Sequence, residues 1–104
     1  MKIVYFGTPE IASSQLEAII AAGYEVAAVV TVPDKPAGRG KKIQSSDVKL
    51  TALKYNLPVL QPISLKSPEF IEELSSYNAD LFVVVAFRML PEVVWSMPPM
   101  GTFN

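Results

Sequence analysis

The stretch Lys2-Ile3-Val4-Tyr5-Phe6-Gly7-Thr8-Pro9 decides the fold class. Its compact apolar run ends at a glycine, which is the pattern of a buried parallel strand followed by a tight turn. Thr8 is expected to cap a helix with Pro9 at its first helical position, and Gly23 to end that helix. Residues 24–31 then form a second apolar run. This strand-helix-strand order predicts a right-handed parallel crossover and so the start of a doubly wound parallel α/β sheet.

The remaining sequence continues the same alternation. A helix is expected from Ser46 or Asp47 to about residue 55, and another begins at Ser67. The run 79–86 is the most apolar in the chain and predicts a central strand. Further elements are expected as short strands at 57–60 and 101–104 and a short helix over 90–97.

Composition narrows the possible chemistry. Half of the 104 residues are hydrophobic, which suits one small domain with a real core. The sequence contains neither cysteine nor histidine, so it offers no disulfide, no thiolate zinc site and no histidine base. No apolar run reaches about 18 residues and no signal-peptide layout is present, which favours a cytoplasmic protein without a membrane segment.

Charge is distributed unevenly along the chain. The formal net charge is −1, yet five of the nine basic residues lie between positions 35 and 49. Prolines and glycines interrupt residues 32–46, which are therefore expected to form a long surface loop without regular structure. Such a loop suits contact with phosphates, although a merely solubilising loop has the same composition. Its length exceeds that of ordinary strand-to-helix connections and favours a function. The basic residues are Lys35, Arg39, Lys41, Lys42 and Lys49.

Two strand ends are candidate ligand sites, because open α/β sheets bind ligands beyond the carboxyl ends of their strands. The first, Gly7-Thr8-Pro9, lacks the G-x-G-x-x-G pattern of dinucleotide-binding loops, so Gly7 is interpreted as allowing a sharp turn. The second, Ala86-Phe87-Arg88-Met89-Leu90-Pro91, has apolar residues that could wall a flat heterocycle. A plain strand-to-helix junction with Phe87 and Leu90 in the core explains it equally well. Trp95 and Pro98-Pro99 are assigned to packing and a turn.

Several of these segments resemble one known family in order and spacing. The segments are Phe6-Gly7-Thr8-Pro9, the run from Pro33 to Lys42 (P-D-K-P-A-G-R-G-K-K), Leu57 to Pro62 (L-P-V-L-Q-P), Val83 to Phe87 (V-V-V-A-F) and Gly101 to Asn104 (G-T-F-N). The sequence is similar over essentially its whole length to the methionyl-tRNA formyltransferases. Other formyltransferases share the strands and the final asparagine, but not the P-D-K-P-A-G-R-G-K-K loop.

The resemblance implies a function and a set of site residues. The fold would be the Rossmann-like formyltransferase fold, and the reaction would move a formyl group from 10-formyltetrahydrofolate to the amino group of methionyl initiator tRNA, without a metal. Asn104 would be catalytic, its amide donating a hydrogen bond to the formyl oxygen. Lys35, Arg39, Lys41 and Lys42 would contact the tRNA. The pterin pocket would be lined by Phe87, Arg88, Met89 and Leu90, with Phe87-Arg88 in place of the family's common Tyr-Gly.

The resemblance also implies that residues 1–104 are the N-terminal part of a catalytic domain. The remainder of that domain, with the catalytic histidine and aspartate, and a C-terminal tRNA-binding domain would be absent. The parent enzyme is expected to be a cytoplasmic monomer that uses folate and tRNA, and this chain alone is expected to be inactive. Two alternatives remain open: a formyltransferase for an amino-sugar or ribonucleotide, and a non-catalytic nucleic-acid-binding module.

Overall fold

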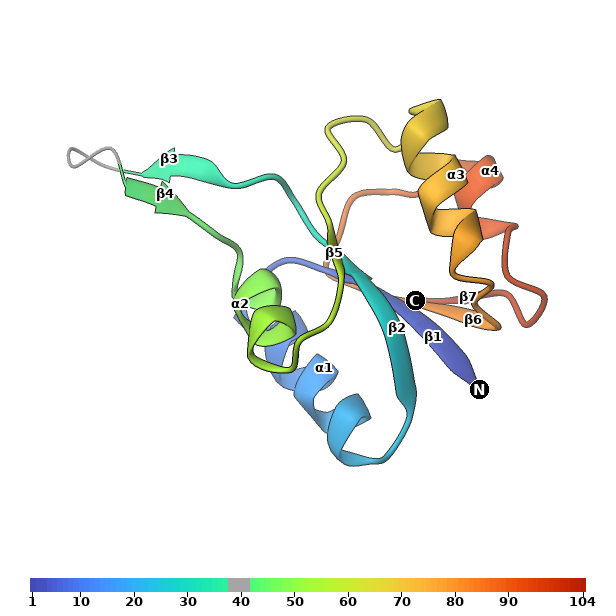
Figure 1. Ribbon diagram of the computed structural model, residues 1–104, viewed down its shortest axis with the longest axis horizontal. Coiled ribbons are helices and arrows are strands. Elements are labelled where there is room, and N and C mark those ends of the chain that lie inside the picture. Colours follow the sequence, from blue (N-terminus) through green and yellow to red (C-terminus); the bar gives the residue numbers. More distant parts are fainter. Residues whose placement is uncertain (38–41) are drawn as a thin grey trace.

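The computed structural model describes residues 1–37 and 42–104. Helices lie on both sides of a parallel sheet, and a narrow two-stranded ribbon projects away from the body (Figure 1). The elements in chain order are β1 (Lys2–Gly7), α1 (Glu10–Ala21), β2 (Glu25–Val30), β3 (Lys35–Ala37), β4 (Lys42–Gln44), α2 (Asp47–Lys54), β5 (Val59–Leu60), α3 (Pro68–Ser76), β6 (Leu81–Val85), α4 (Glu92–Trp95) and β7 (Thr102–Phe103).

The main sheet has five strands in the order β5-β2-β1-β6-β7, all parallel. The chain builds outward from β1 to β2 and β5, and then crosses back to place β6 and β7 on the other side. This reversal puts a topological switch point between the carboxyl ends of β1 and β6, where open α/β sheets form ligand crevices. The doubly wound Rossmann-like fold predicted from the sequence is therefore confirmed.

Two hydrophobic clusters hold the layers together. On one face of the sheet, Tyr5 and Val29 pack with Leu16 of α1 and Val48 of α2. On the other face, the clustered side chains come from the strands, from α3 and from α4; among them are Phe6, Phe82, Phe70, Leu74 and Val94. Because each face is covered by helices, the inner strands carry apolar residues on both sides and read as continuous hydrophobic runs.

Gly7 differs from the sequence interpretation. Gly7 ends β1 without a positive φ angle, so it does not serve a turn that only glycine can make. A Cβ atom at this position would lie 2.8 Å from the Ala12 Cβ, 3.0 Å from the Val85 carbonyl oxygen and 3.1 Å from the Tyr5 ring. The absence of a side chain lets β1, α1 and β6 approach one another at the switch point, which is a packing requirement.

The helix ends follow the sequence with one exception. Pro9, not Thr8, is the N-cap of α1, because the Pro9 carbonyl accepts from the Ala12 and Ser13 amides while Pro9 itself keeps an extended backbone. Gly23 has a φ of 91° and ends α1 in a Schellman motif, as predicted. Ser46 and Ser67 cap α2 and α3 through their hydroxyl groups, also as predicted.

The expectation of an irregular loop over residues 32–46 was wrong. β3 and β4 pair as an antiparallel ribbon in which Lys35 is opposite Gln44 and Ala37 is opposite Lys42. Proline and glycine discouraged a strand prediction here, yet both strands of a two-stranded ribbon are edges, where a proline without an amide hydrogen is tolerated. The ribbon leaves the sheet after β2 and returns directly into α2.

Candidate functional site

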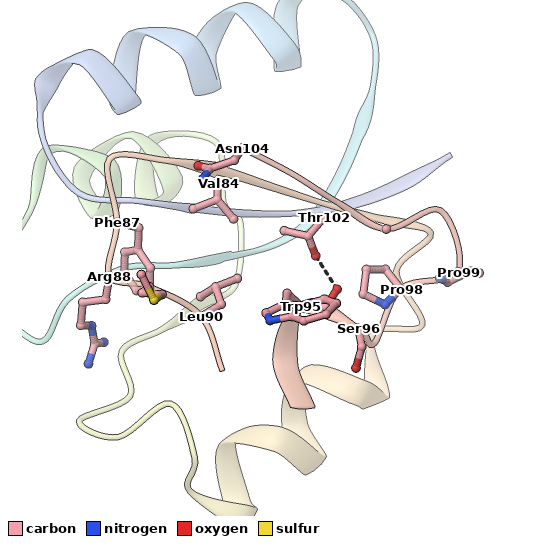
Figure 2. A pocket seen from close by; sticks show the side chains of 12 residues that line it. Val84, Phe87, Arg88, Leu90, Trp95, Ser96, Pro98, Pro99, Thr102 and Asn104 are labelled. Carbon is pink, nitrogen blue, oxygen red and sulfur yellow. Dashed lines mark hydrogen bonds between the residues drawn. The ribbon is translucent and has the colours of Figure 1, made fainter. Parts of the chain in front are cut away.

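A cavity of about 940 Å³ lies beyond the carboxyl end of β6. Residues from the β6–α4 connection form one wall, and residues from α4 through β7 form the other (Figure 2). Its volume is within the range of small-molecule sites, and most of its lining is apolar or aromatic. The lining residues are Val84, Phe87, Arg88, Met89, Leu90, Trp95, Ser96, Pro98, Pro99, Gly101, Thr102 and Asn104.

An unusual backbone conformation begins this wall. Ala86 has a φ of 50°, in the left-handed region that L-residues other than Asn and Asp rarely adopt. This conformation costs about 1–2 kcal/mol. Ala86 directly follows β6, and the turn that it makes directs Phe87 back toward the sheet. Strain at the start of a cavity wall, at the end of a central strand, is typical of a functional site.

Phe87 serves both the wall and the core. Its ring meets the Phe6 ring edge-on, with 5.9 Å between the ring centroids, and Phe87 and Leu90 both pack partly buried against the hydrophobic cluster beneath. Phe87 and Leu90 therefore line the cavity and also pack against the core, and the binding of a flat heterocycle at this wall stays a prediction. Met89 is 94% exposed and contributes only to the rim.

Arg88 extends away from the other lining side chains (Figure 2). Its two terminal nitrogens donate to the carbonyl oxygens of Pro62, at 2.9 Å, and Ile63, at 3.1 Å. The guanidinium carbon also lies 5.1 Å from the centroid of the Phe87 ring, in cation–π range. Arg88 therefore ties the cavity wall to the segment that follows β5. The sequence did not indicate this role.

The opposite wall contains residues that the sequence reasoning missed. Trp95, Pro98 and Pro99 were assigned to packing and a turn, but all three line the cavity. Thr102 donates its hydroxyl to the Trp95 carbonyl at 2.7 Å and so joins β7 to α4 (Figure 2). Trp95 is 46% exposed in the structure. The available signal in the sequence was an aromatic residue three positions before a Pro-Pro pair.

The predicted catalytic and pterin-pocket residues come together. Asn104, directly after β7, lines the same cavity as all four residues of the Phe87–Leu90 segment. Asn104 directly follows Phe103, which pairs with Val83 of β6, and both Val84 and Asn104 line the cavity (Figure 2). An apolar cavity with one convergent amide can enclose a flat heterocycle and offer a hydrogen-bond donor to a polar group on it.

The predicted tRNA-contacting residues are only partly described. Lys35 is exposed on β3, and the backbone of Lys42 pairs with Ala37 in the ribbon. Arg39 and Lys41 lie outside the described residues. Lys49, which belonged to the same basic stretch, instead lies on α2 with its ammonium 2.6 Å from the Asp34 carboxylate. Lys49 is therefore engaged with a carboxylate of the same region.

Within residues 1–37 and 42–104, no group of three or more Asp and Glu side chains is arranged to hold a metal ion. In that same part of the chain, no helix has the length and hydropathy needed to cross a membrane.

Comparison with known proteins gives this arrangement a family. The model of the formyl transferase family matches residues 1–104, and the chain belongs to that family. Proteins named methionyl-tRNA formyltransferase are similar over the whole chain: it is 59% identical to one from Bacteroides fragilis, 58% to one from Bacteroides thetaiotaomicron and 55% to one from Flavobacterium johnsoniae. The chain covers 32% of the two Bacteroides proteins and 33% of the third, about one third of each relative's length.

Proposed function

We propose that a protein containing this chain transfers a formyl group from 10-formyltetrahydrofolate to the amino group of methionyl initiator tRNA. The observation that carries the proposal is the cavity at the end of β6, which gathers Asn104 and the Phe87–Leu90 wall in a chain of the formyl transferase family. Identities of 55–59% to proteins named methionyl-tRNA formyltransferase support this acceptor over a sugar or a nucleotide. The protein acts in the cytoplasm as a monomer and needs no metal.

The cavity fits the pterin of the formyl donor. Phe87, Leu90 and Trp95 supply apolar surface for a flat ring, and backbone groups of the β6–α4 connection can read its edge. Asn104 donates its amide hydrogen to the formyl oxygen as negative charge develops there during amine attack. The donor amide has to be in place before reaction, and the attachment of Asn104 to β7 meets that need.

The ribbon is the element that meets the acceptor. Lys35 and Lys42 lie on its strands, and Arg39 and Lys41 lie between those strands in the sequence, on a chain whose formal net charge is −1. Cations on a projecting element pair with phosphates without reading base sequence. The ribbon therefore supplies affinity and register for the tRNA acceptor end, and the cavity supplies the chemistry.

A graft tests the proposal. Residues 1–104 replace the matching third of the Bacteroides fragilis relative, and formylation of methionyl-tRNA is measured with 10-formyltetrahydrofolate. Asn104→Ala should lower kcat by on the order of 100- to 1000-fold, the cost of losing one oxyanion donor. The control Glu72→Gln changes an exposed residue on α3 and should leave kcat unchanged.

Two results would count against the proposal. The first is a graft that formylates an amino-sugar or ribonucleotide in preference to methionyl-tRNA. The second is an Asn104→Ala graft with full kcat. Separately, we expect no turnover by residues 1–104 alone, because a chain without histidine lacks the general base expected for the amine.

A further inference from the structure

A cluster of polar side chains lies where the ribbon leaves the sheet and where it returns. The outgoing segment runs from β2 to β3 and the returning segment runs from β4 into α2. A two-stranded ribbon is at best marginally stable by itself, and Lys35 and Gln44 on its two strands are exposed. Its direction relative to the sheet must therefore be set by contacts at its base.

Asp34, on the outgoing segment, uses both carboxylate oxygens in these contacts. One oxygen accepts from the Lys49 ammonium on α2 at 2.6 Å, and the other accepts from the Gln61 amide beyond β5 at 2.8 Å. The same Gln61 amide nitrogen donates to the Val32 carbonyl at 3.1 Å. Two points of the outgoing segment are thus attached to α2 and to the end of a sheet strand.

A second set of contacts joins the two segments to each other. The Thr31 and Ser46 hydroxyl oxygens lie 2.6 Å apart, across the gap between the outgoing and the returning chain. The Ser46 oxygen also accepts a hydrogen bond from the Lys49 backbone amide at 3.0 Å, and this hydrogen bond caps the N-terminus of α2. The cap of the helix and the base of the ribbon are therefore one hydrogen-bonded unit.

The electrostatics favour a persistent ion pair. The side chains of Lys49 and Asp34 are only 18% and 26% exposed, so solvent screens this pair less than a fully exposed one. The hydrogen bonds from Lys49 and Gln61, with a further one from Ser45, lower the pKa of Asp34 against the opposing effect of desolvation. The carboxylate is therefore charged at neutral pH. The stability that this carboxylate contributes is fully present above pH 3.8, its pKa in the unfolded chain, and is lost as the pH falls through its lower pKa in the folded chain.

We propose that Asp34 is a positioning residue that, through Lys49 and Gln61, fixes the β3–β4 ribbon relative to the parallel sheet. On the proposed function, on which this consequence rests, the fixed ribbon presents its cations to the tRNA at a set distance from the cavity. Asp34 does not touch the reacting groups in this scheme. It affects the binding of the tRNA acceptor and not the binding of the formyl donor.

The direct test measures orientation in residues 1–104. Residual dipolar couplings of amides 35, 37 and 42–44 are compared with those of β1 and β6. In the unchanged chain, one alignment tensor should fit both sets. In Asp34→Asn, which puts an amide donor opposite the Lys49 ammonium, the ribbon couplings should fall and no longer fit the tensor of the sheet. The double variant Asp34→Asn with Lys49→Gln, a neutral amide pair, should restore part of the fit.

A matched control comes from the other side of α2. Lys54 and Glu17 form an ion pair at 3.3 Å that is 65% and 42% exposed and links α2 to α1 away from the ribbon. Glu17→Gln should leave the ribbon couplings unchanged. Ribbon couplings that still fit the tensor of the sheet in Asp34→Asn, or that fall equally in Glu17→Gln, would overturn the proposal.

The graft described above measures the consequence. Asp34→Asn should raise KM for methionyl-tRNA about tenfold, since misplacing a binding element costs one to two orders of magnitude. The values of kcat and of KM for 10-formyltetrahydrofolate should stay within about twofold, a split that general destabilisation would not produce. An unchanged tRNA KM with a loosened ribbon overturns this consequence. If the unchanged graft does not formylate tRNA, the proposed function fails, and the couplings still decide the positioning role.

Discussion

Gly7→Ala is the substitution that most directly tests the packing at the switch point. The added Cβ would lie 2.8 Å from the Ala12 Cβ and 3.0 Å from the Val85 carbonyl oxygen. Carbon atoms at their best separation are about 3.5–4.0 Å apart, so α1 has to move away from β1 by about 0.7 Å or more. Neither neighbour is the end of a flexible side chain that could turn away.

The expected cost follows from two opposing effects. Overpacking of this kind destabilises by about 1–3 kcal/mol. Replacing glycine stiffens the unfolded chain, which returns about 0.4–1 kcal/mol. The free energy of unfolding should therefore fall by about 1.5 kcal/mol, which for a domain of this size lowers Tm by roughly 6–12 °C.

Urea unfolding followed by far-ultraviolet circular dichroism measures this change. Ala12→Gly alone should cost about 1 kcal/mol, because glycine is a poor helix former. In the Gly7→Ala background the same change removes the closest contact. The double variant should therefore lose less stability than the sum of the two single losses, by at least about 0.5 kcal/mol. A Gly7→Ala variant as stable as the unchanged chain, or two strictly additive costs, would refute the packing argument.

Three further predictions use other contacts. Arg88→Met removes the hydrogen bonds to Pro62 and Ile63 and should lower the free energy of unfolding by about 1 kcal/mol, less than for a buried charged hydrogen bond because Arg88 is partly exposed. Urea unfolding midpoints and hydrogen exchange of the amides at 63–66 measure the effect. Unchanged exchange would contradict the attachment of the cavity wall to the segment after β5. Ser67→Ala removes the N-cap of α3 and should also lower the free energy of unfolding by about 1 kcal/mol. Ser67→Asp should retain stability, and a loss in Ser67→Asp as large as that in Ser67→Ala would contradict the capping role. Burial raises the pKa of Tyr5 from 10.0 to about 12, so the free energy of unfolding should fall as the pH rises from about 10 to 12. In Tyr5→Phe this part of the pH dependence should be missing. Identical pH profiles of the two proteins would refute the prediction.

The elements that the sequence predicted well are those determined by local pattern. β1, β2 and β6 are apolar runs because both faces of the sheet are covered, and the Ser46 and Ser67 caps depend on residues at most three positions away. The ribbon was missed because the composition of this stretch suggested no strand. Its strands form only through the pairing of residues 35–37 with 42–44. The cap at Pro9 was misplaced by one residue, within the ordinary uncertainty of helix ends.

The candidate site shows the same division. The sequence pointed to the Phe87–Leu90 segment because it follows the most apolar strand, and this segment does line the cavity. Trp95 joined the site through tertiary geometry, since α4 brings it opposite a wall that precedes it in the chain. The contacts of Asp34 reach partners 15 and 27 positions away, and no periodicity reports such pairs. The roles of Asn104 and of the basic ribbon residues remain predictions.

The parallel sheet also affects how this chain is made. β1 pairs with β6, and the Lys2 amide donates to the Asp80 carboxylate across 78 positions of sequence. At synthesis rates of roughly 5–20 residues per second, the ribosome needs about 4–16 s to add the partner of β1. Throughout that interval the strand that becomes the centre of the sheet has at least one open edge. A nascent-chain chaperone that binds short apolar strands would therefore encounter Ile3–Phe6 as an early and long-lived target.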